Sequence, residues 1–294
     1  MAHAEVAIRS WQVSASPGEQ GTRVKIGFWY GFIDDGIHPV DLGKALEERG
    51  FEGLVLGEHT NLPVQDIATS PSEEQARTHP RITDPLVTLG VIAGATERLT
   101  LGTAVLLAAQ HEPIVTAKAI ASLDAISGGR VVIGIGAGWH DGELRQHGVD
   151  PKKKVTVLRE HMLAMREIWT KDEAEFHGEH VDFAPLQSWP KPPSGPIVLV
   201  GGGKNPAWRK INEYADGWLP IYTGDPDALI EDIAELRARA GDRPLPVTVM
   251  NAPPDKDVLA KLAEAGVERA LLELKRTDRD TTLTTLDQHA GLVT

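Results

Sequence analysis

Short apolar runs alternate with helical patterns along most of the chain, and this alternation constrains the fold more than any other feature. Eight such runs follow residue 23, at 24–30, 53–57, 98–105, 130–136, 196–201, 217–222, 246–251 and 269–275. Short, nearly continuous β-branched runs are typical of strands buried on both faces of a parallel sheet. Eight strands, each followed by a helix, predict an α/β fold of the (β/α)8 TIM-barrel type. An open doubly wound sheet is the alternative with a similar strand count.

The helical segments between these runs carry their own signals. One helix is predicted to begin at Pro113 and to end at Gly128, because proline suits the first helical turn and glycine suits the position after the last. Another is indicated by apolar residues at steps of three or four, which a single buried face requires. These residues are Val155, Leu158, Met162, Met165 and Trp169.

Two connections are longer than a minimal barrel needs. Residues 58–83 form a polar insertion after the second strand, and residues 171–195 predict a hairpin with a proline-rich return before the fifth strand. Long connections in a compact domain are usually lids or binding loops. We further expect residues 1–23 to be an N-terminal extension and residues 24–294 to form a single barrel domain.

Composition excludes several classes of function. The net charge of −12 and the absence of a strong basic cluster argue against nucleic acid or an anionic membrane as partner. The chain has no cysteine, which excludes disulfides, zinc–thiolate sites, iron–sulfur clusters and cysteine nucleophiles. It also has no apolar run near the roughly 20 residues of a membrane span and no secretory signal pattern at its N-terminus. These features fit a cytoplasmic protein without a membrane partner.

Three motifs fail when they are tested against familiar signatures. In SGGRVVIGIGAGWHDGE, residues 127–143, Trp139 takes the third glycine position of a dinucleotide-binding G-x-G-x-x-G. In GGGK, residues 201–204, the P-loop pattern is broken because Asn205 stands where a serine or threonine is required. HGEH, residues 177–180, falls on the predicted hairpin and indicates a solvated surface. We therefore predict no metal site.

What remains is the position of residues at the carboxyl ends of the strands, where barrel active sites form. Glycine there lets backbone N–H groups approach a ligand closely, which we predict for Gly138 and for 201–203. For Gly134 we expect the structural role of relieving crowding inside the barrel.

Glu58 and His59 form the one adjacent acid–histidine pair at a strand end. His59 would be a general acid or base, or a hydrogen-bond donor to a bound ring, or a buried histidine satisfied by backbone. Aromatic residues at strand ends would provide flat pocket walls, although they are equally typical of a barrel core. They are Trp29, Tyr30, Trp139 and Tyr222.

Longer blocks of this sequence resemble a known family. LGTAVLLAAQHEPIVTAKAIASLDAISGGRVVIGIGAGWHDGE, FHGEHVDF and PIVLVGGGKNPAWRKINEYADGWLP are similar to the bacterial luciferase-like monooxygenase superfamily, and especially to its branch that uses the deazaflavin coenzyme F420. The likeness covers about residues 24–222. It implies a (β/α)8 barrel with insertions, a homodimer, and F420 or FMN held at the carboxyl-terminal mouth.

The resemblance also assigns residues to the cofactor. The end of the third strand would press against the ring through Thr103, Ala104 and Val105, with a non-proline cis peptide at Ala104–Val105. The segment after the fourth strand would line the ring through Ala137, Gly138 and Trp139. The phosphate would be met by the end of the fifth strand, at Val200, Gly201, Gly202 and Gly203. His59 falls where F420-dependent relatives carry a histidine near the reactive carbon. Trp139 stands where some sugar-phosphate dehydrogenases of the family have an acid, which argues against that activity.

The sequence thus predicts an F420-dependent oxidoreductase that moves hydride between the deazaflavin and a small organic substrate. His59 would handle the proton, Glu58 would orient it or shape the rim, and residues 58–83 would be a lid. Trp29, Tyr30 and Tyr222 would line the substrate pocket. The alternatives are an FMN-dependent monooxygenase that uses reduced flavin and O₂, and a flavin-binding protein without catalysis.

Overall fold

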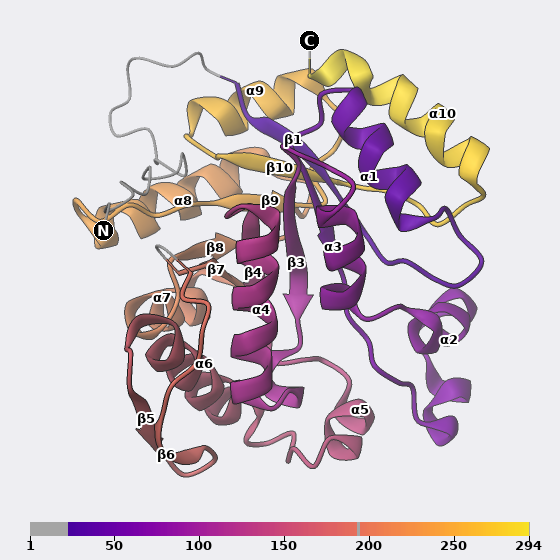
Figure 1. Cartoon of the computed structure of the whole chain (residues 1–294). Coiled ribbons are helices and arrows are strands. Elements are labelled where there is room, and N and C mark those ends of the chain that lie inside the picture. Colours follow the sequence, from indigo (N-terminus) through magenta and orange to yellow (C-terminus); the bar gives the residue numbers. More distant parts are fainter. Residues whose placement is uncertain (1–22, 193–194, 294) are drawn as a thin grey trace, which may run out of the picture.

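The structure, a computed structural model, describes residues 23–192 and 195–293 (Figure 1). The predicted N-terminal extension therefore lies outside the described residues, apart from Arg23. The Arg23 guanidinium donates a hydrogen bond of 2.7 Å to the carbonyl oxygen of Leu292, which ties the start of the described chain to its end.

Eight parallel strands form one sheet that curls into a nearly closed barrel. They are β1 (Lys25–Tyr30), β2 (Gly53–Leu56), β3 (Thr100–Leu106), β4 (Val131–Ile135), β7 (Ile197–Gly201), β8 (Gly217–Leu219), β9 (Thr248–Met250) and β10 (Arg269–Glu273). Their order is β8-β7-β4-β3-β2-β1-β10-β9. Bridges between Trp218 and Val247 and between Ile221 and Met250 join the two outer strands. The predicted (β/α)8 barrel is confirmed, and an open sheet is excluded.

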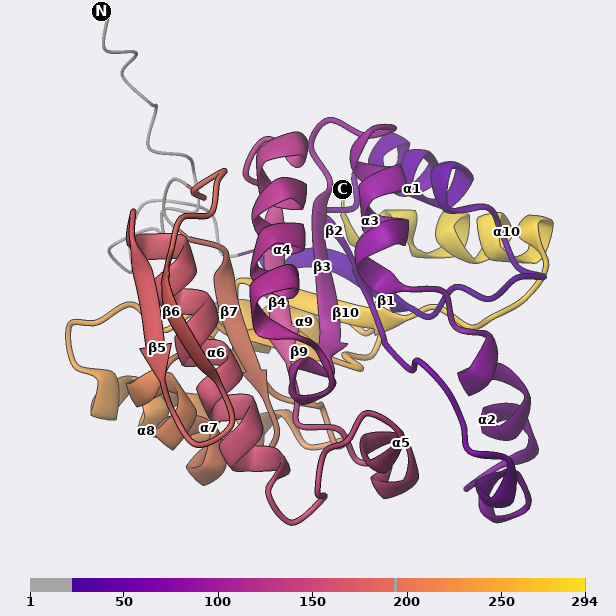
Figure 2. The same ribbon diagram turned by 60° about the horizontal axis from the view of Figure 1, so that its bottom comes forward.

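Helices surround the barrel. They are α1 (Pro39–Glu48), α3 (Pro85–Ala93), α4 (Pro113–Ser127), α6 (Lys154–Thr170), α7 (Lys204–Glu213), α8 (Pro226–Ala240), α9 (Lys256–Glu264) and α10 (Arg279–His289), with the short extra helices α2 (Glu73–Thr78) and α5 (Asp141–Gln146). Figures 1 and 2 both place α2 and α5 beyond the tip of the β3 arrow, at the carboxyl-terminal end of the barrel. These two helices therefore sit over the predicted active-site mouth.

The helix signals in the sequence hold with one exception. Helix α4 begins at Pro113, and the Glu112 carboxylate accepts hydrogen bonds from the first turn; Gly128 ends the helix in the left-handed conformation. Four of the five apolar residues predicted on α6 are buried, but Val155 is 55 % exposed. Val155 lies in the first turn of α6, and Val157 continues the buried face in its place.

Successive residues of each strand point to opposite faces of the sheet, which separates two cores. The inner cluster fills the barrel, and its buried members are Val55, Ala104, Val132, Leu199, Leu219 and Leu271. A larger cluster packs between the sheet and the helices. The barrel is tight at Gly134, because an added Cβ would collide with the Thr103 carbonyl oxygen and lie 2.7 Å from a Leu219 methyl group. The structural role predicted for Gly134 is confirmed.

Two additional segments interrupt the βα repeat. Between β2 and α3 the chain forms η1 (Val64–Thr69), α2 and η2 (His79–Arg81). Between α6 and β7 it forms the antiparallel hairpin of β5 (Ala174–His177) and β6 (Asp182–Leu186). Within the described part of the chain, no helix has the length and apolar character to cross a membrane.

Candidate functional site

The end of β3 carries the predicted non-proline cis peptide, at Ala104–Val105. The register between β3 and β4 shifts between Thr103 and Leu106, and the side chains of Ala104 and Val105 both join the inner cluster. Thr103 is buried, and its hydroxyl donates to the Gly134 carbonyl oxygen at 2.8 Å. The structure therefore turns Ala104 and Val105 toward the barrel interior, while Thr103 is engaged in joining β3 to β4.

The end of β4 contributes one backbone and one aromatic feature to the rim. Gly138 has a φ of +80°, a conformation that glycine adopts at little cost. Trp139 is 51 % exposed, and its ring meets those of His59 and His79 edge-on, with centroids 5.7 and 5.9 Å apart. Ala137 instead packs against the outer core. Trp139 is thus the side chain that this segment presents at the mouth.

The end of β7 forms an open cradle of main-chain groups. Gly202 has a φ of +103°, and a Cβ added at Gly202 or Gly203 would meet no heavy atom within 4 Å. Helix α7 starts directly after Gly203 without a side-chain cap, so the N–H groups of Lys204 and Asn205 remain available to an anion, whereas Pro206 has no N–H. The Trp218 indole donates to the Gly202 carbonyl oxygen at 2.8 Å and holds this loop. Val200 is fully buried in the outer core, so it could reach a ligand only through its main chain.

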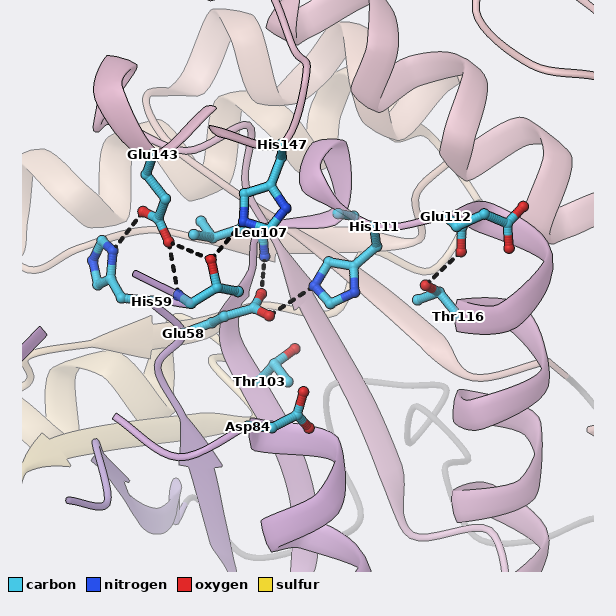
Figure 3. Close-up of polar contacts among 12 residues, drawn as sticks. Glu58, His59, Asp84, Thr103, Leu107, His111, Glu112, Thr116, Glu143 and His147 are labelled. Carbon is cyan, nitrogen blue, oxygen red and sulfur yellow. Dashed lines mark hydrogen bonds and ion pairs between the residues drawn. The ribbon is translucent and has the colours of Figure 1, made fainter. Parts of the chain in front are cut away.

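His59 is held by an acid that the sequence did not single out. Its Nδ1 lies 2.8 Å from Oε2 of Glu143 on α5 (Figure 3). The other carboxylate oxygen, Oε1, accepts from the Thr60 N–H at 2.8 Å and from the Thr60 hydroxyl at 3.2 Å. Burial by itself would raise the pKa of Glu143, but the hydrogen bonds from His59 and Thr60 and the charge of His59 outweigh it and lower this pKa. Glu143 is therefore ionised at neutral pH.

A second histidine covers the ring of His59. His79 of η2 stacks on it with centroids 4.1 Å apart and planes 11° apart. Burial, together with the nearby charges of His59 and Arg276, lowers the pKa of His79 to about 4. His79 is therefore neutral near pH 7, and it brings the segment between β2 and α3 onto the mouth.

Glu58 has a different partner from the one predicted. Its carboxylate accepts from the Leu107 N–H at 2.5 Å and lies 2.7 Å from His111 Nε2 (Figure 3). Burial alone would lower the pKa of His111, but the hydrogen bond to Glu58 and its charge raise it. Glu58 thus ties β2 to the segment after the cis peptide and does not orient His59, so of its two predicted roles only the shaping of the rim stays a prediction. Both residues follow β2, and each meets a different partner: Glu58 meets the segment after β3, and His59 meets α5.

The alternation of side chains along β1 corrects one of the predicted pocket walls. Trp29 packs on the inner cluster, and its indole donates to Asn251 Oδ1 at 2.6 Å. Tyr30, the next residue, is fully buried in the outer core beside Phe32. Tyr222 follows β8 and is half-buried with one side against the outer core, so its place in the substrate pocket stays a prediction.

The residues that sequence reasoning missed are Glu143, His79, His111 and Trp218. A local signal for Glu143 existed, because it ends the stretch 127–143 and occupies the third position of a short helix whose N-cap is His140. Glutamate at that position commonly closes a capping box. Here its side chain crosses to residues 59 and 60 instead, which no local pattern indicates.

Comparison with known proteins agrees with this architecture. The family model for luciferase-like monooxygenases matches residues 31–255. An uncharacterised protein of Mycobacterium tuberculosis (strain ATCC 25618 / H37Rv) is 38 % identical over 257 residues, which cover 82 % of this chain and 90 % of that protein. The phthiodiolone/phenolphthiodiolone dimycocerosates ketoreductase of the same strain is 30 % identical over 235 residues, covering 74 % of this chain and 61 % of the ketoreductase.

Solved structures share the fold at low identity. Monooxygenase RslO1 from Streptomyces bottropensis has a TM-score of 0.72 at 17 % identity, covering 91 % of this chain and 98 % of that one. An F420-dependent secondary alcohol dehydrogenase with an F420–acetone adduct has a TM-score of 0.70 at 16 % identity, with 92 % and 99 % covered. The oxygenating constituent of 3,6-diketocamphane monooxygenase from Pseudomonas putida, in complex with FMN, scores 0.62 at 19 % identity, with 78 % and 67 % covered. The barrel and the extent of the family match together identify the chain as a member of the luciferase-like monooxygenase family.

Proposed function

We propose that the protein is an F420-dependent oxidoreductase acting on a small organic substrate. The observation that carries this proposal is the open main-chain cradle of Gly202, Gly203 and the uncapped start of α7, on the same rim as the Ala104–Val105 cis peptide and His59. These residues fit a cofactor with a phosphate and a flat ring, because free N–H groups suit the phosphate and Val105 and Trp139 offer apolar surface to the ring. When bound, the deazaflavin would supply the hydride acceptor or donor.

In this proposal the protein's own residues place the substrate and manage the proton. His59, 12 % exposed at its side chain, exchanges a proton with the substrate oxygen. Trp29 and the exposed Trp139 form apolar walls that hold a small substrate and displace water from it. Since the relatives include a ketoreductase and a secondary alcohol dehydrogenase by name, we propose an alcohol–carbonyl pair as the substrate class.

The second candidate is an FMN-dependent monooxygenase, favoured by the fold neighbour in complex with FMN. A phosphate cradle serves both cofactors. A titration of the purified protein with F420 and, separately, with FMN, followed by ligand fluorescence, distinguishes the two. Micromolar or tighter binding of F420 with weak binding of FMN supports the dehydrogenase. The opposite preference would favour the monooxygenase, and binding of neither would overturn both.

A matched pair of substitutions at Gly203 tests the phosphate cradle. Gly203 has ordinary extended backbone at the N-cap of α7, where both aspartate and asparagine are preferred. Gly203→Asp adds a negative charge beside the cradle and Gly203→Asn does not. A like charge at about 4 Å costs about 1–4 kcal/mol, depending on the effective dielectric constant. We therefore expect F420 to bind at least about tenfold more weakly to Gly203→Asp than to Gly203→Asn, with similar melting temperatures. Equal affinities would place the phosphate elsewhere.

We also propose a homodimer formed through α3 and α4, which lie side by side on the outside of the barrel (Figure 1). These two helices carry exposed apolar residues, which are Val87 and Val91 on α3 and Val115 and Ile126 on α4. Val91→Glu should convert the dimer into a monomer, because it buries a charge in an apolar contact. Light scattering after size-exclusion chromatography measures the molar mass of the wild-type and variant proteins. Val64→Glu, at an 82 % exposed position on η1, is the control expected to leave the mass unchanged. A monomeric wild-type protein would contradict the proposal.

A further inference from the structure

The acid that holds His59 is itself fixed in place. The Glu143 side chain is 1 % exposed, and both of its oxygens are engaged, Oε2 by His59 and Oε1 by the Thr60 N–H and hydroxyl. Thr60 follows His59 directly in the chain, so one carboxylate grips two adjacent residues of the same loop. An ionised carboxylate that accepts several hydrogen bonds cannot rotate without losing them. Its direction therefore sets the orientation of the imidazole ring.

We propose that Glu143 is a positioning residue that holds neutral His59 in the tautomer with hydrogen on Nδ1 and leaves Nε2 free to take a proton from substrate. The tautomer follows from the donor and acceptor inventory. A carboxylate without a proton only accepts, so the His59 Nδ1 must donate across the 2.8 Å contact. In the neutral ring the second nitrogen is then an acceptor. Among the described residues, no hydrogen bond occupies Nε2, which points away from Glu143 in Figure 3.

Two aromatic side chains pack around the ring of His59. His79 stacks on one face of it and is itself neutral near pH 7, because its pKa is lowered to about 4, while Trp139 meets the ring edge-on. Besides His59, the ionisable groups that act on the stacked His79 are Arg276 after β10, Glu143 on α5 and His140, whose ring meets that of Trp139. Glu143 is the only one of them in hydrogen-bonding contact with His59 within the described chain, so it dominates the choice of tautomer.

The catalytic consequence rests on the proposed function. Oxidation of a secondary alcohol would break a C–H bond, and a bound oxidised deazaflavin would supply the acceptor for that hydrogen and its electron pair. The O–H bond would also break, and its proton would pass to Nε2 of His59 as the carbonyl forms. Carbonyl reduction runs the same transfers in reverse, with His59 protonated at the start. Alcohol oxidation should therefore require neutral His59 and carbonyl reduction its protonated form, which makes their pH profiles opposite in direction.

The tautomer can be measured without any cofactor. In the protein labelled with ¹⁵N-histidine, two-bond and three-bond couplings distinguish protonated from unprotonated ring nitrogens. His59 is assigned among the 11 histidines by its loss in the spectrum of His59→Gln. We expect hydrogen on Nδ1 and none on Nε2 in the wild-type protein at a pH where the His59 ring carries a single proton. Hydrogen on Nε2 would overturn the proposal, and this result needs no variant that could misfold.

Two variants then separate positioning from packing. Glu143→Gln can donate as well as accept, so the Nε2–H tautomer should become populated. Turnover should fall about 10²-fold, while the affinity for F420 stays unchanged. Asp141→Asn removes a carboxylate from the exposed side of the same helix and should alter neither the His59 signals nor turnover. A wild-type tautomer in Glu143→Gln would contradict the proposal. Failure of the F420 titration would instead reject the proposed function and leave the tautomer result standing.

Discussion

His59→Gln should reduce turnover by about 10²–10⁴-fold, the range typical for loss of a general acid or base. The reason is that a buried carboxylate orients the ring of His59 at the mouth and engages only its Nδ1, which leaves Nε2 for a proton of the substrate. The affinity for F420 should stay close to that of the wild-type protein, because the proposed phosphate cradle lies on a different strand. Steady-state kinetics with an alcohol or ketone series, combined with the fluorescence titration, measures both quantities.

A matched histidine provides the control for this prediction. His177 lies on the β5–β6 hairpin, where it pairs with Asp182 at 2.6 Å and is largely exposed. His177→Gln should leave turnover and cofactor affinity as they are. If His59→Gln retained wild-type turnover on a substrate that the protein converts, His59 would have no part in the proton transfer, and the mechanism proposed above would be wrong.

Gly134→Ala should destabilise the fold by about 1–3 kcal/mol or more, because it overpacks a barrel without free space. The new methyl group would collide with the Thr103 carbonyl oxygen and with a Leu219 methyl group, so two neighbouring strands would have to separate. Urea denaturation of the wild-type and variant proteins measures the loss as a lower midpoint at an unchanged slope.

Gly90→Ala is the matched control for the barrel glycine. Gly90 lies inside α3, and a Cβ there would meet no heavy atom within 4 Å. Since alanine is the better helix former by up to about 1 kcal/mol, this variant should be as stable as the wild-type protein or slightly more stable. Equal midpoints for Gly134→Ala and the wild-type protein would mean that the strands can separate at little cost.

Much of the fold could be predicted from the sequence because its signals are local. The eight apolar runs correspond to the eight barrel strands, and Pro113 and Gly128 bound α4 as predicted. Sequence resemblance placed the cis peptide at Ala104–Val105, where the structure has it. A local pattern is sufficient in such cases, since hydrogen bonding and side-chain direction repeat along the chain with the period of the element.

The sequence could also have predicted that adjacent strand residues face opposite sides of the sheet. Trp29 and Tyr30 are adjacent in β1, and the alternation of side chains already requires that only one of them faces the barrel interior. Which of the two does so depends on how the strand is rotated against its neighbours. The packing of Trp29 against Asn251, 222 residues away, decided this.

The sequence by itself determined the barrel, its glycine-rich rim and the presence of a histidine at the end of β2. Only the tertiary structure decided the partners of the polar groups there: Glu143 holds His59 from 84 positions away, and Glu58 turns to His111. The physical reason is that a buried carboxylate must bind whichever donors the folded chain brings within about 3 Å. Those donors are selected by the path of the chain through space, which no periodicity along the sequence records.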